Sequence, residues 1–347
     1  MKNKPKFRCN IGGQAVLEGV MMKTPESIAL AVRHSDGSIT IKNEKFVPYA
    51  KRNKFLGLPV VRGVAAFVES LVVGTKTITD SAKILEEEER RIAAKKAEEA
   101  AGLGAAENTD ALKESARPRS KTKEGLSIAI AVTISLIIFI ALFIWLPNFM
   151  TNLIKPLIVR DPAVLTAGES IILNLIEGFL RILVFVGYLL TVTLMKDIRR
   201  VFMYHGAEHK VIHCFENGEV LMVENARKYK TSHPRCGTSY LFLVMVVAIL
   251  LFSLLGWSGD ILTRVGLRLL MLPVVAGLAY EVLRLAAKSD AWPLRVIRAP
   301  GVLLQKLSTR EPDDSMIEVA IAAFNAAAEN TSSIADEIKP KGNKDGH

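Results

Sequence analysis

A run of 21 residues without a charged side chain, at positions 126–146, restricts this chain more than any other feature of its sequence. At 1.5 Å per residue, a helix of this length crosses the roughly 30 Å hydrocarbon core of a bilayer. Three further apolar segments follow, at 170–195, 239–257 and 266–286. Half of the 347 residues are hydrophobic, as is typical of a membrane protein. We therefore expect a mainly α-helical membrane protein with about four transmembrane helices.

Two of these apolar segments contain charged residues. Glu177 and Arg181 lie four residues apart in the second segment, and the fourth contains Arg268, Glu281 and Arg284. Residues four apart share a helix face, where opposite charges neutralise each other. Ionisable groups inside a membrane are costly and commonly functional. Glu177, Arg181 and Glu281 are therefore candidates either for pairing helices or for lining a transport pathway.

Basic residues around the apolar segments predict the direction in which the chain crosses the membrane. Lysines and arginines precede the first segment and follow the second, whereas the loop between these two segments contains only Lys155 and Arg160. Because basic flanks are retained in the cytoplasm, both termini and residues 196–238 are expected on that side. The flanks also account for the net charge of +10, so we expect no nucleic-acid partner. Charged residues interrupt the N-terminal region, so we expect no cleavable signal peptide. The apolar segments predict a multi-pass protein of the cell membrane.

The remaining segments predict a small cytoplasmic α+β portion. Apolar stretches on both sides of Asp36-Gly37 predict a β-hairpin between Ser27 and Phe46. Residues 60–85 have helical spacing and should pack on the bundle or lie in the membrane interface, and a second amphipathic helix should begin near Pro312. The chain is thus expected to divide into an α+β element (1–85), a charged linker that begins as an exposed helix and becomes disordered (86–124), a four-span membrane domain (125–300), a C-terminal cytoplasmic amphipathic helix (301–332) and a disordered tail (333–347).

Four of the six histidines and two of the three cysteines lie within 32 residues of the cytoplasmic segment. We expect a helix that continues from the second apolar segment and carries His205, His209 and His213, whose spacing of four places them on one stripe. The H-x-x-E-H pattern that includes Glu208 is typical of enzymes in which two histidines bind zinc and the glutamate is the general base. Asn217-Gly218 predicts a turn, and residues 220–223 predict a short strand.

A second motif, which contains His233 and Cys236, precedes the third apolar segment. Proline and glycine punctuate this motif, so it should form a rigid turn at the membrane surface. It lies close to the histidine stripe if the segment folds back on the helix. Three cysteines are too few for a disulfide framework and indicate a reducing compartment or a thiolate role for Cys236.

Four motifs in this order resemble those of a known family. They are GGQAVLEGVMM from Gly12, HGAEHKVIHCFE from His205, HPRCGTS from His233 and TREPDD from Thr309. In these motifs, and over nearly its whole length, the chain resembles the YqhQ-like family of bacterial membrane proteins, a family of unknown function described as predicted metal-dependent enzymes. The resemblance implies a metal and gives these motif positions: Gln14, Glu18, His205, Glu208, His209, His213, His233 and Cys236. Gly12-Gly13 permits close backbone approach, and Gln14 and Glu18 would share a face if this segment is helical.

These observations favour a divalent-metal site, with zinc as the expected ion, at the cytoplasmic face. In the leading hypothesis the protein is a metal-dependent hydrolase of unknown substrate, with Glu208 as the catalytic base and ligands drawn from His205, His209, His213, His233 and Cys236. The same ligands also suit a closed structural zinc site. Two alternatives stay open: an oligomeric transporter or channel subunit whose cluster senses metal or is structural, and a membrane scaffold. The expected partners are the lipid bilayer and, for the transporter, further copies of the chain.

Overall fold

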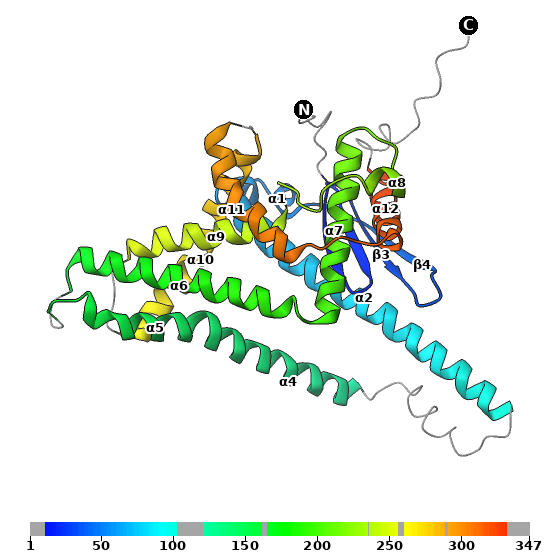
Figure 1. The fold of residues 1–347 in the computed structure, drawn as a ribbon, viewed down its shortest axis with the longest axis horizontal. Coiled ribbons are helices and arrows are strands. Elements are labelled where there is room, and N and C mark those ends of the chain that lie inside the picture. Colours follow the sequence, from blue (N-terminus) through cyan, green and yellow to red (C-terminus); the bar gives the residue numbers. More distant parts are fainter. Residues whose placement is uncertain are drawn as a thin grey trace, which may run out of the picture.

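The computed structural model describes residues 11–102, 121–161, 165–234, 236–255, 260–288 and 291–331. Long helices occupy one side of the molecule, and a smaller portion with a β-sheet occupies the other (Figure 1). The fold class expected from the sequence, mainly α with a small α+β portion, is therefore confirmed. The predicted tail at 333–347 lies outside the described residues.

The β-sheet is an antiparallel meander of four strands in the order β1-β2-β3-β4. The strands are β1 (Gly12–Val16), β2 (Gly19–Lys23), β3 (Ser27–Arg33) and β4 (Ile39–Lys45). The hairpin predicted around Asp36-Gly37 joins β3 to β4, and Gly37 has a φ of +87°, which glycine adopts without strain. Gln14 lies in β1, and Glu18 lies in the β1–β2 turn with a φ of +49°. The helical arrangement considered for these two residues is therefore wrong.

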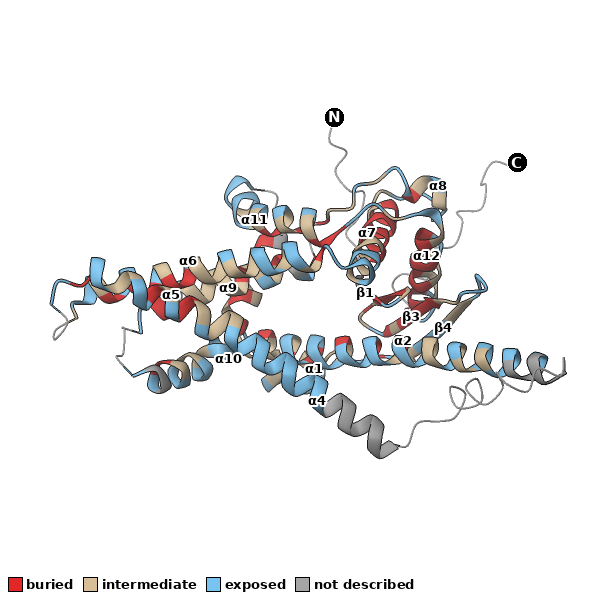
Figure 2. Ribbon diagram, turned by 60° about the horizontal axis from the view of Figure 1, so that its bottom comes forward, coloured by how far each residue is buried: buried red, intermediate tan, exposed pale blue. Residues whose placement is uncertain are grey.

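The two faces of the sheet pack against different helices. One face, which includes Val20, Met22 and Ala31, packs against α7 (Lys196–Glu216) and α12 (Asp314–Glu329). The opposite face, which includes Met21 and Leu30, packs against α2 (Val61–Gly102). Neighbouring residues such as Val20 and Met21 lie on different faces because successive side chains of a strand point to opposite sides of the sheet. Figure 2 shows the buried residues of α7 and α12 in the region where both helices cover the sheet.

The helices predicted at both ends of the chain are present. After α1 (Tyr49–Arg52) and the short turn η1 (Phe55–Gly57), helix α2 covers the predicted 60–85 segment and continues to Gly102. The first part of the predicted linker is thus helical, residues 103–120 lie outside the described chain, and α4 begins at Lys121. Helix α12 starts beside Asp313, whose side chain accepts a hydrogen bond from the amide of Met316 at 3.0 Å.

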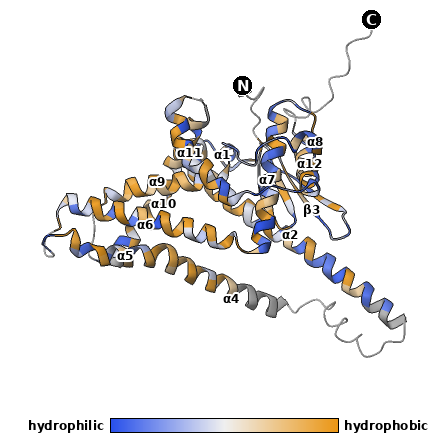
Figure 3. Cartoon of the chain, viewed as in Figure 1, coloured by the Kyte–Doolittle hydropathy of each residue, from blue (hydrophilic) through white to orange (hydrophobic). Residues whose placement is uncertain are grey.

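Three helical stretches in the described chain are long and apolar enough to cross a membrane: Ile130–Leu157, Ala167–Val192 and Thr263–Ala286. The first stretch consists of four consecutive elements: α4 (Lys121–Ile140), the π-helical turn η3 (Ala141–Trp145), α5 (Leu146–Ile154) and η4 (Lys155–Leu157). The second stretch is α6 (Ala167–Val192), and the third lies within α10 (Ile261–Lys288). The predicted span at 239–257 forms the shorter helix α9 (Gly237–Ser253), whose 17 residues extend about 25 Å. Hydrophobic residues dominate all of these helices (Figure 3).

The charged residues in these helices connect one helix to another. Arg181 donates to Glu177 at 2.6 Å, as their spacing predicts, and Arg268 of α10 donates to the same carboxylate at 2.9 Å. Arg181 also donates to the carbonyl of Phe143 at 3.2 Å. In a regular helix that carbonyl would pair with residue 147, which is a proline and has no amide hydrogen.

Glu281 also contacts a different helix. It accepts two hydrogen bonds from Arg62 of α2, at 2.7 and 2.6 Å. This pair joins α2 to α10, where the two helices also pack closely at Gly63 and Gly277. Helix α2 therefore packs on the bundle at its first turns and on the sheet along its middle, around Val73 and Ile84.

Two expectations about the segment between α6 and α9 are wrong. Helix α7 does not continue α6, because residues 193–195 separate them and turn the chain sharply (Figure 1). No strand forms at residues 220–223, all four of which the structure describes. Residues Val223–Ala226 instead form the helical turn α8. The turn at Asn217-Gly218 is present, and Gly218 has a φ of +72°. Helix α11 (Trp292–Ser308) then links α10 to the segment before α12.

Candidate metal centre

Helix α7 is unbroken from Lys196 to Glu216, so His205, His209 and His213 follow one another at successive turns. Residues 231–234 and Cys236 lie back along this helix. Nδ1 of His209 donates to the carbonyl of Thr231, and Nε2 of His213 donates to that of Ser232 at 2.9 Å. The two motifs, separate in sequence, therefore lie side by side.

His205, His209 and Cys236 form a first triad, whose potential ligand atoms lie within 4.8 Å of one another. Nδ1 of His205 donates to the carbonyl of Ser308 at 2.8 Å, and Nε2 lies 3.1 Å from Sγ of Cys236. In both histidines the Nδ1 hydrogen is thus given to a backbone carbonyl, which leaves the lone pair on Nε2. Nε2 of His209 is buried and has no hydrogen-bond partner among the described residues.

Electrostatics keep His209 suitable as a ligand. Burial lowers the pKa of His209, whereas the neighbouring Cys236 acts in the opposite direction. A lowered pKa favours the neutral imidazole, which is the form that binds a metal ion.

His213 and His233 belong to a second triad, with Glu216, whose ligand atoms also lie within 4.8 Å of one another. The five ligands considered from the sequence therefore do not converge on one point. The reason is helical rise, because His205 and His213 are eight residues, or about 12 Å, apart along α7. Sequence reasoning missed Glu216, although its place three residues after His213 puts both on one helix face.

Glu208 is buried on the side of α7 that faces β1. Its carboxylate accepts a hydrogen bond from the backbone N–H of Gly13, and a Cβ atom at Gly13 would lie 2.7 Å from Cδ of Glu208. The close backbone approach that Gly12-Gly13 permits is thus present at Gly13, whereas a Cβ at Gly12 would meet no atom within 4 Å. Burial raises the pKa of Glu208 to about 7, while His205 and the Gly13 amide act to lower it. Oε2 of Glu208 is buried without a hydrogen-bond partner in the described part of the chain.

The TREPDD motif crosses α7 next to the histidines. The backbone amide of Arg310 donates to the carbonyl of Phe202 at 2.9 Å, and only a glycine at position 206 leaves room for this crossing, since a Cβ there would lie 2.1 Å from the Arg310 carbonyl oxygen. Glu311 pairs with the buried Lys210 at 2.6 Å. Lys210 in turn donates to the carbonyls of residues 227 and 229, which supports the segment that precedes Thr231.

Gln305 of α11 fixes the backbone of the second motif. Its side chain is fully buried, accepts from the amide of His233 at 2.7 Å and donates to the carbonyl of His233 at 2.8 Å. Sequence reasoning missed Gln305 because it lies 72 residues from His233 and belongs to no recognisable motif.

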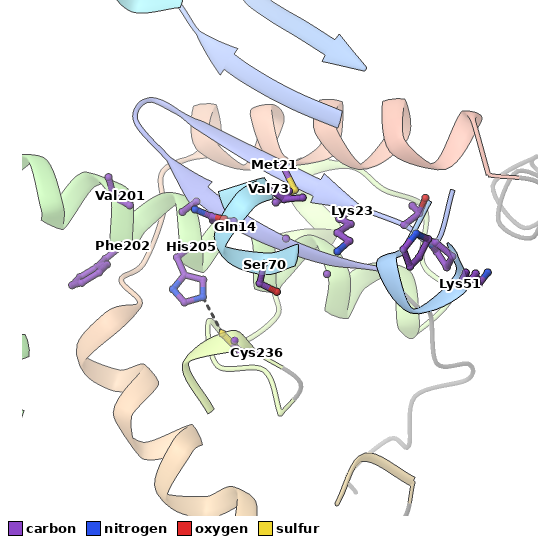
Figure 4. Close-up of a pocket in the computed structure, with 17 residues that line it drawn as sticks. Gln14, Met21, Lys23, Lys51, Ser70, Val73, Val201, Phe202, His205 and Cys236 are labelled. Carbon is purple, nitrogen blue, oxygen red and sulfur yellow. Dashed lines mark hydrogen bonds between the residues drawn. The ribbon is translucent and has the colours of Figure 1, made fainter. Parts of the chain in front are cut away.

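A cavity of about 850 Å³ adjoins the first triad, between the sheet, α2, α7 and the start of α9. His205 and Cys236 line one side of it, and Lys23 and Lys51 lie on the other (Figure 4). Gln14 also lines the cavity and packs against α2, where a Cβ at Gly74 would lie 2.8 Å from Gln14 Oε1.

The other candidate residues lie elsewhere. Glu18 accepts two hydrogen bonds from Arg200 at 2.5 Å and one from Tyr204 at 3.2 Å, which ties the β1–β2 turn to α7. Glu177, Arg181 and Glu281 contact other membrane helices or α2 and do not border the histidine cluster.

Comparison with known proteins agrees with the four motifs. Residues 58–330 match the protein family of unknown function DUF1385. The uncharacterised protein YqhQ of Bacillus subtilis (strain 168) is 32% identical over 324 residues, which cover 93% of each chain. No solved structure matches. The chain therefore belongs to the DUF1385 family, whose function is unknown.

Proposed function

We propose that this protein is a metal-dependent hydrolase that holds Zn²⁺ through His205, His209 and Cys236. The observation that carries the proposal is Nε2 of His209, which is buried without a hydrogen-bond partner among the described residues, while Nδ1 is held by Thr231. An unsatisfied polar atom in a protein interior is costly, and a metal ion would satisfy it. Two imidazole nitrogens and one thiolate sulfur are a donor set that zinc favours.

Access favours a catalytic site over a closed structural one. A catalytic zinc site keeps one coordination position for water or substrate. His205 and Cys236 border the cavity of about 850 Å³, so a small molecule can reach this triad. Bound there, zinc would supply the Lewis acidity that hydrolysis of a carbonyl or phosphoryl group needs.

The protein's own groups would bind the substrate and move the proton. Glu208, whose pKa burial raises to about 7, would take a proton from water through Oε2, while the Gly13 amide holds the carboxylate in place. Lys23 and Lys51 on the opposite side of the cavity would attract an anionic part of the substrate. Much of the remaining lining is apolar, including Met21, Val73 and Phe202, which suits an amphipathic substrate.

The site would face the cytoplasm, with four membrane crossings. Helix α7 and the later helix α12 pack on the same sheet, so the chain between them must cross the membrane an even number of times. This requirement supports α9 and α10 crossing as a pair, although α9 is short, and local thinning of the bilayer accommodates such a mismatch. The same argument pairs the α4–α5 stretch with α6. The basic flanks then orient the sheet and α7 toward the cytoplasm.

Turnover by purified protein tests the proposed function. Zn²⁺-loaded protein in detergent would be assayed against a panel of carboxylic esters and phosphodiesters and against vesicles of bacterial lipid extract. We expect Glu208→Gln to keep its metal but to lower turnover of any hydrolysed substrate by about 10²- to 10⁴-fold, because a base moves the proton and does not hold the ion. Unchanged turnover in this variant would exclude Glu208 as the base. Metal loss in this variant would make Glu208 a ligand instead and favour a structural site.

A further inference from the structure

We propose that His213, Glu216 and His233 form a second divalent-cation site, separate from the first triad and structural in role. The three side chains offer ligand atoms within 4.8 Å of one another. Glu216 and His233 are each only 3% exposed, and the rings of His213 and His233 lie 4.5 Å apart between centroids. The proposal concerns residues that the proposed hydrolysis does not use, so it stands or falls separately.

The surroundings orient these side chains before any ion binds. Nε2 of His213 donates to the Ser232 carbonyl, which puts the lone pair on Nδ1. His233 is fixed through its backbone, where Gln305 bonds both its amide and its carbonyl. Such outer contacts hold ligands in place in metal sites.

The donor atoms of this cluster suit a divalent cation. Oε2 of Glu216 lies 3.3 Å from Nε2 of His233, and His213 offers a further ligand nitrogen within 4.8 Å of the ligand atoms of both residues. One cation could therefore be bound by the carboxylate and both imidazoles. Two histidines and one glutamate are a ligand set found with zinc and with non-haem iron.

The second triad is too far from the first to share an ion with it. The midpoint of His205 and His209 lies 7.5 residues before the midpoint of His213 and Glu216, which corresponds to roughly 11 Å along α7. Metal ions that act together in one reaction lie only about 3.5–4 Å apart. None of the three residues is among those that line the cavity beside His205. These features indicate two single-ion sites, of which the second is enclosed.

An enclosed ion at this position would have a structural effect on the first site. It would join the last turn of α7 to residues 231–236, the segment that carries Cys236. The segment that carries His233 and Cys236 would then be held to α7 at two points. Cys236 contacts His205 at one end of the histidine row, and His233 would share an ion with His213 at the other.

Metal stoichiometry of the full chain in detergent tests this proposal. Bound Zn²⁺ would be measured by equilibrium dialysis with elemental analysis, and Co²⁺ substitution would report thiolate ligation through its charge-transfer absorption. The variants are Glu216→Gln, His213→Ala and Cys236→Ser, with Glu224→Gln as the control, because Glu224 lies exposed in the nearby turn α8. Each variant must elute as a monodisperse species with the helical content of the wild type.

We expect about two equivalents of Zn²⁺ in the wild type and in Glu224→Gln, one for each triad. Glu216→Gln and His213→Ala should each bind about half as much and keep the thiolate absorption. Cys236→Ser should also bind about half as much and lose that absorption.

Three results would overturn one or both proposals. If the wild type binds one equivalent, which Glu216→Gln and His213→Ala retain and Cys236→Ser loses, the second site is wrong and the proposed function stands. If one equivalent is lost in all three variants, the cluster is a single shared site. If Cys236→Ser binds as much as the wild type while Glu216→Gln binds less, the second site stands and the first triad is not a metal site.

Discussion

Gly13 brings the N-terminal strand into contact with Glu208, and this single residue gives a sharp test of the site. A Cβ atom at position 13 would lie 2.7 Å from both Cδ of Glu208 and the carbonyl oxygen of Met21. We therefore expect Gly13→Ala to displace the carboxylate or the strand and to lower the free energy of unfolding by about 1–3 kcal/mol. Thermal unfolding in detergent measures this change.

Gly12→Ala is the matched control, since a Cβ at Gly12 meets no atom within 4 Å. Its effect on stability should stay within about 0.5 kcal/mol. Equal melting temperatures for the two variants would show that β1 does not contact Glu208 in this way.

The chemistry of the individual residues was predictable to the extent that it depends on local spacing. The four-residue spacing predicted that His205 and His209 share one helix face, and the histidine stripe lies on one helix as expected. The same spacing did not predict that His213 belongs to a different triad. Side chains bind one ion only if they lie on the same side of the helix and close together along its axis, and His205 and His213 are about 12 Å apart along α7. The supports from Ser308 and Gln305 come from α11, 103 and 72 residues from their partners, and no local pattern indicates such contacts.

At the scale of elements, the charges inside the membrane helices distinguish helix pairing from a transport pathway. Glu177 accepts from both Arg181 and Arg268, so Glu177→Gln would leave two guanidinium groups without their shared carboxylate. Removing one partner of a buried ion pair costs about 3–5 kcal/mol. Arg181→Gln should cost less, because Glu177 keeps Arg268. Thermal unfolding of both variants in detergent would measure this order.

A Glu177→Gln variant as stable as the wild type but inactive in a growth or flux assay would contradict pairing as the main role of these residues. It would favour the transporter hypothesis instead, because residues that line a pathway serve function without contributing to stability.

The element boundaries also show which structural signals are local. The long apolar helices and the β3–β4 hairpin were predicted, since span length and an Asp-Gly turn are visible in the sequence. The β1–β2 hairpin was not, because its turn places Glu18, rather than a glycine, at positive φ. The turn between α6 and α7 was also missed, since residues 193–195 contain neither proline nor glycine.

At the scale of the whole molecule, we expect the chain to cross the membrane four times and the sheet to lie on the cytoplasmic side. Single cysteines at Arg160, Asp260 and Ser35 would test it by labelling with a membrane-impermeant maleimide. We expect Arg160→Cys and Asp260→Cys to react in intact cells, because these positions follow α5 and precede α10 on the outer side. Ser35→Cys, in the β3–β4 hairpin, should react only after permeabilisation. Labelling of Ser35→Cys in intact cells would reverse the orientation, and protection of Asp260→Cys would exclude the α9–α10 crossing.

The metal content of the purified chain tests the central claim most directly. Elemental analysis would compare the wild type with His209→Ala and with the control His34→Ala, since His34 lies in the sheet portion, where it bonds Glu88 and Thr40. We predict that the wild type and His34→Ala retain the same amount of divalent metal, and that His209→Ala loses about one equivalent per chain because the triad loses a ligand. A wild type that binds no metal after incubation with Zn²⁺, or a His209→Ala variant that binds as much as His34→Ala, would contradict the proposed metal centre.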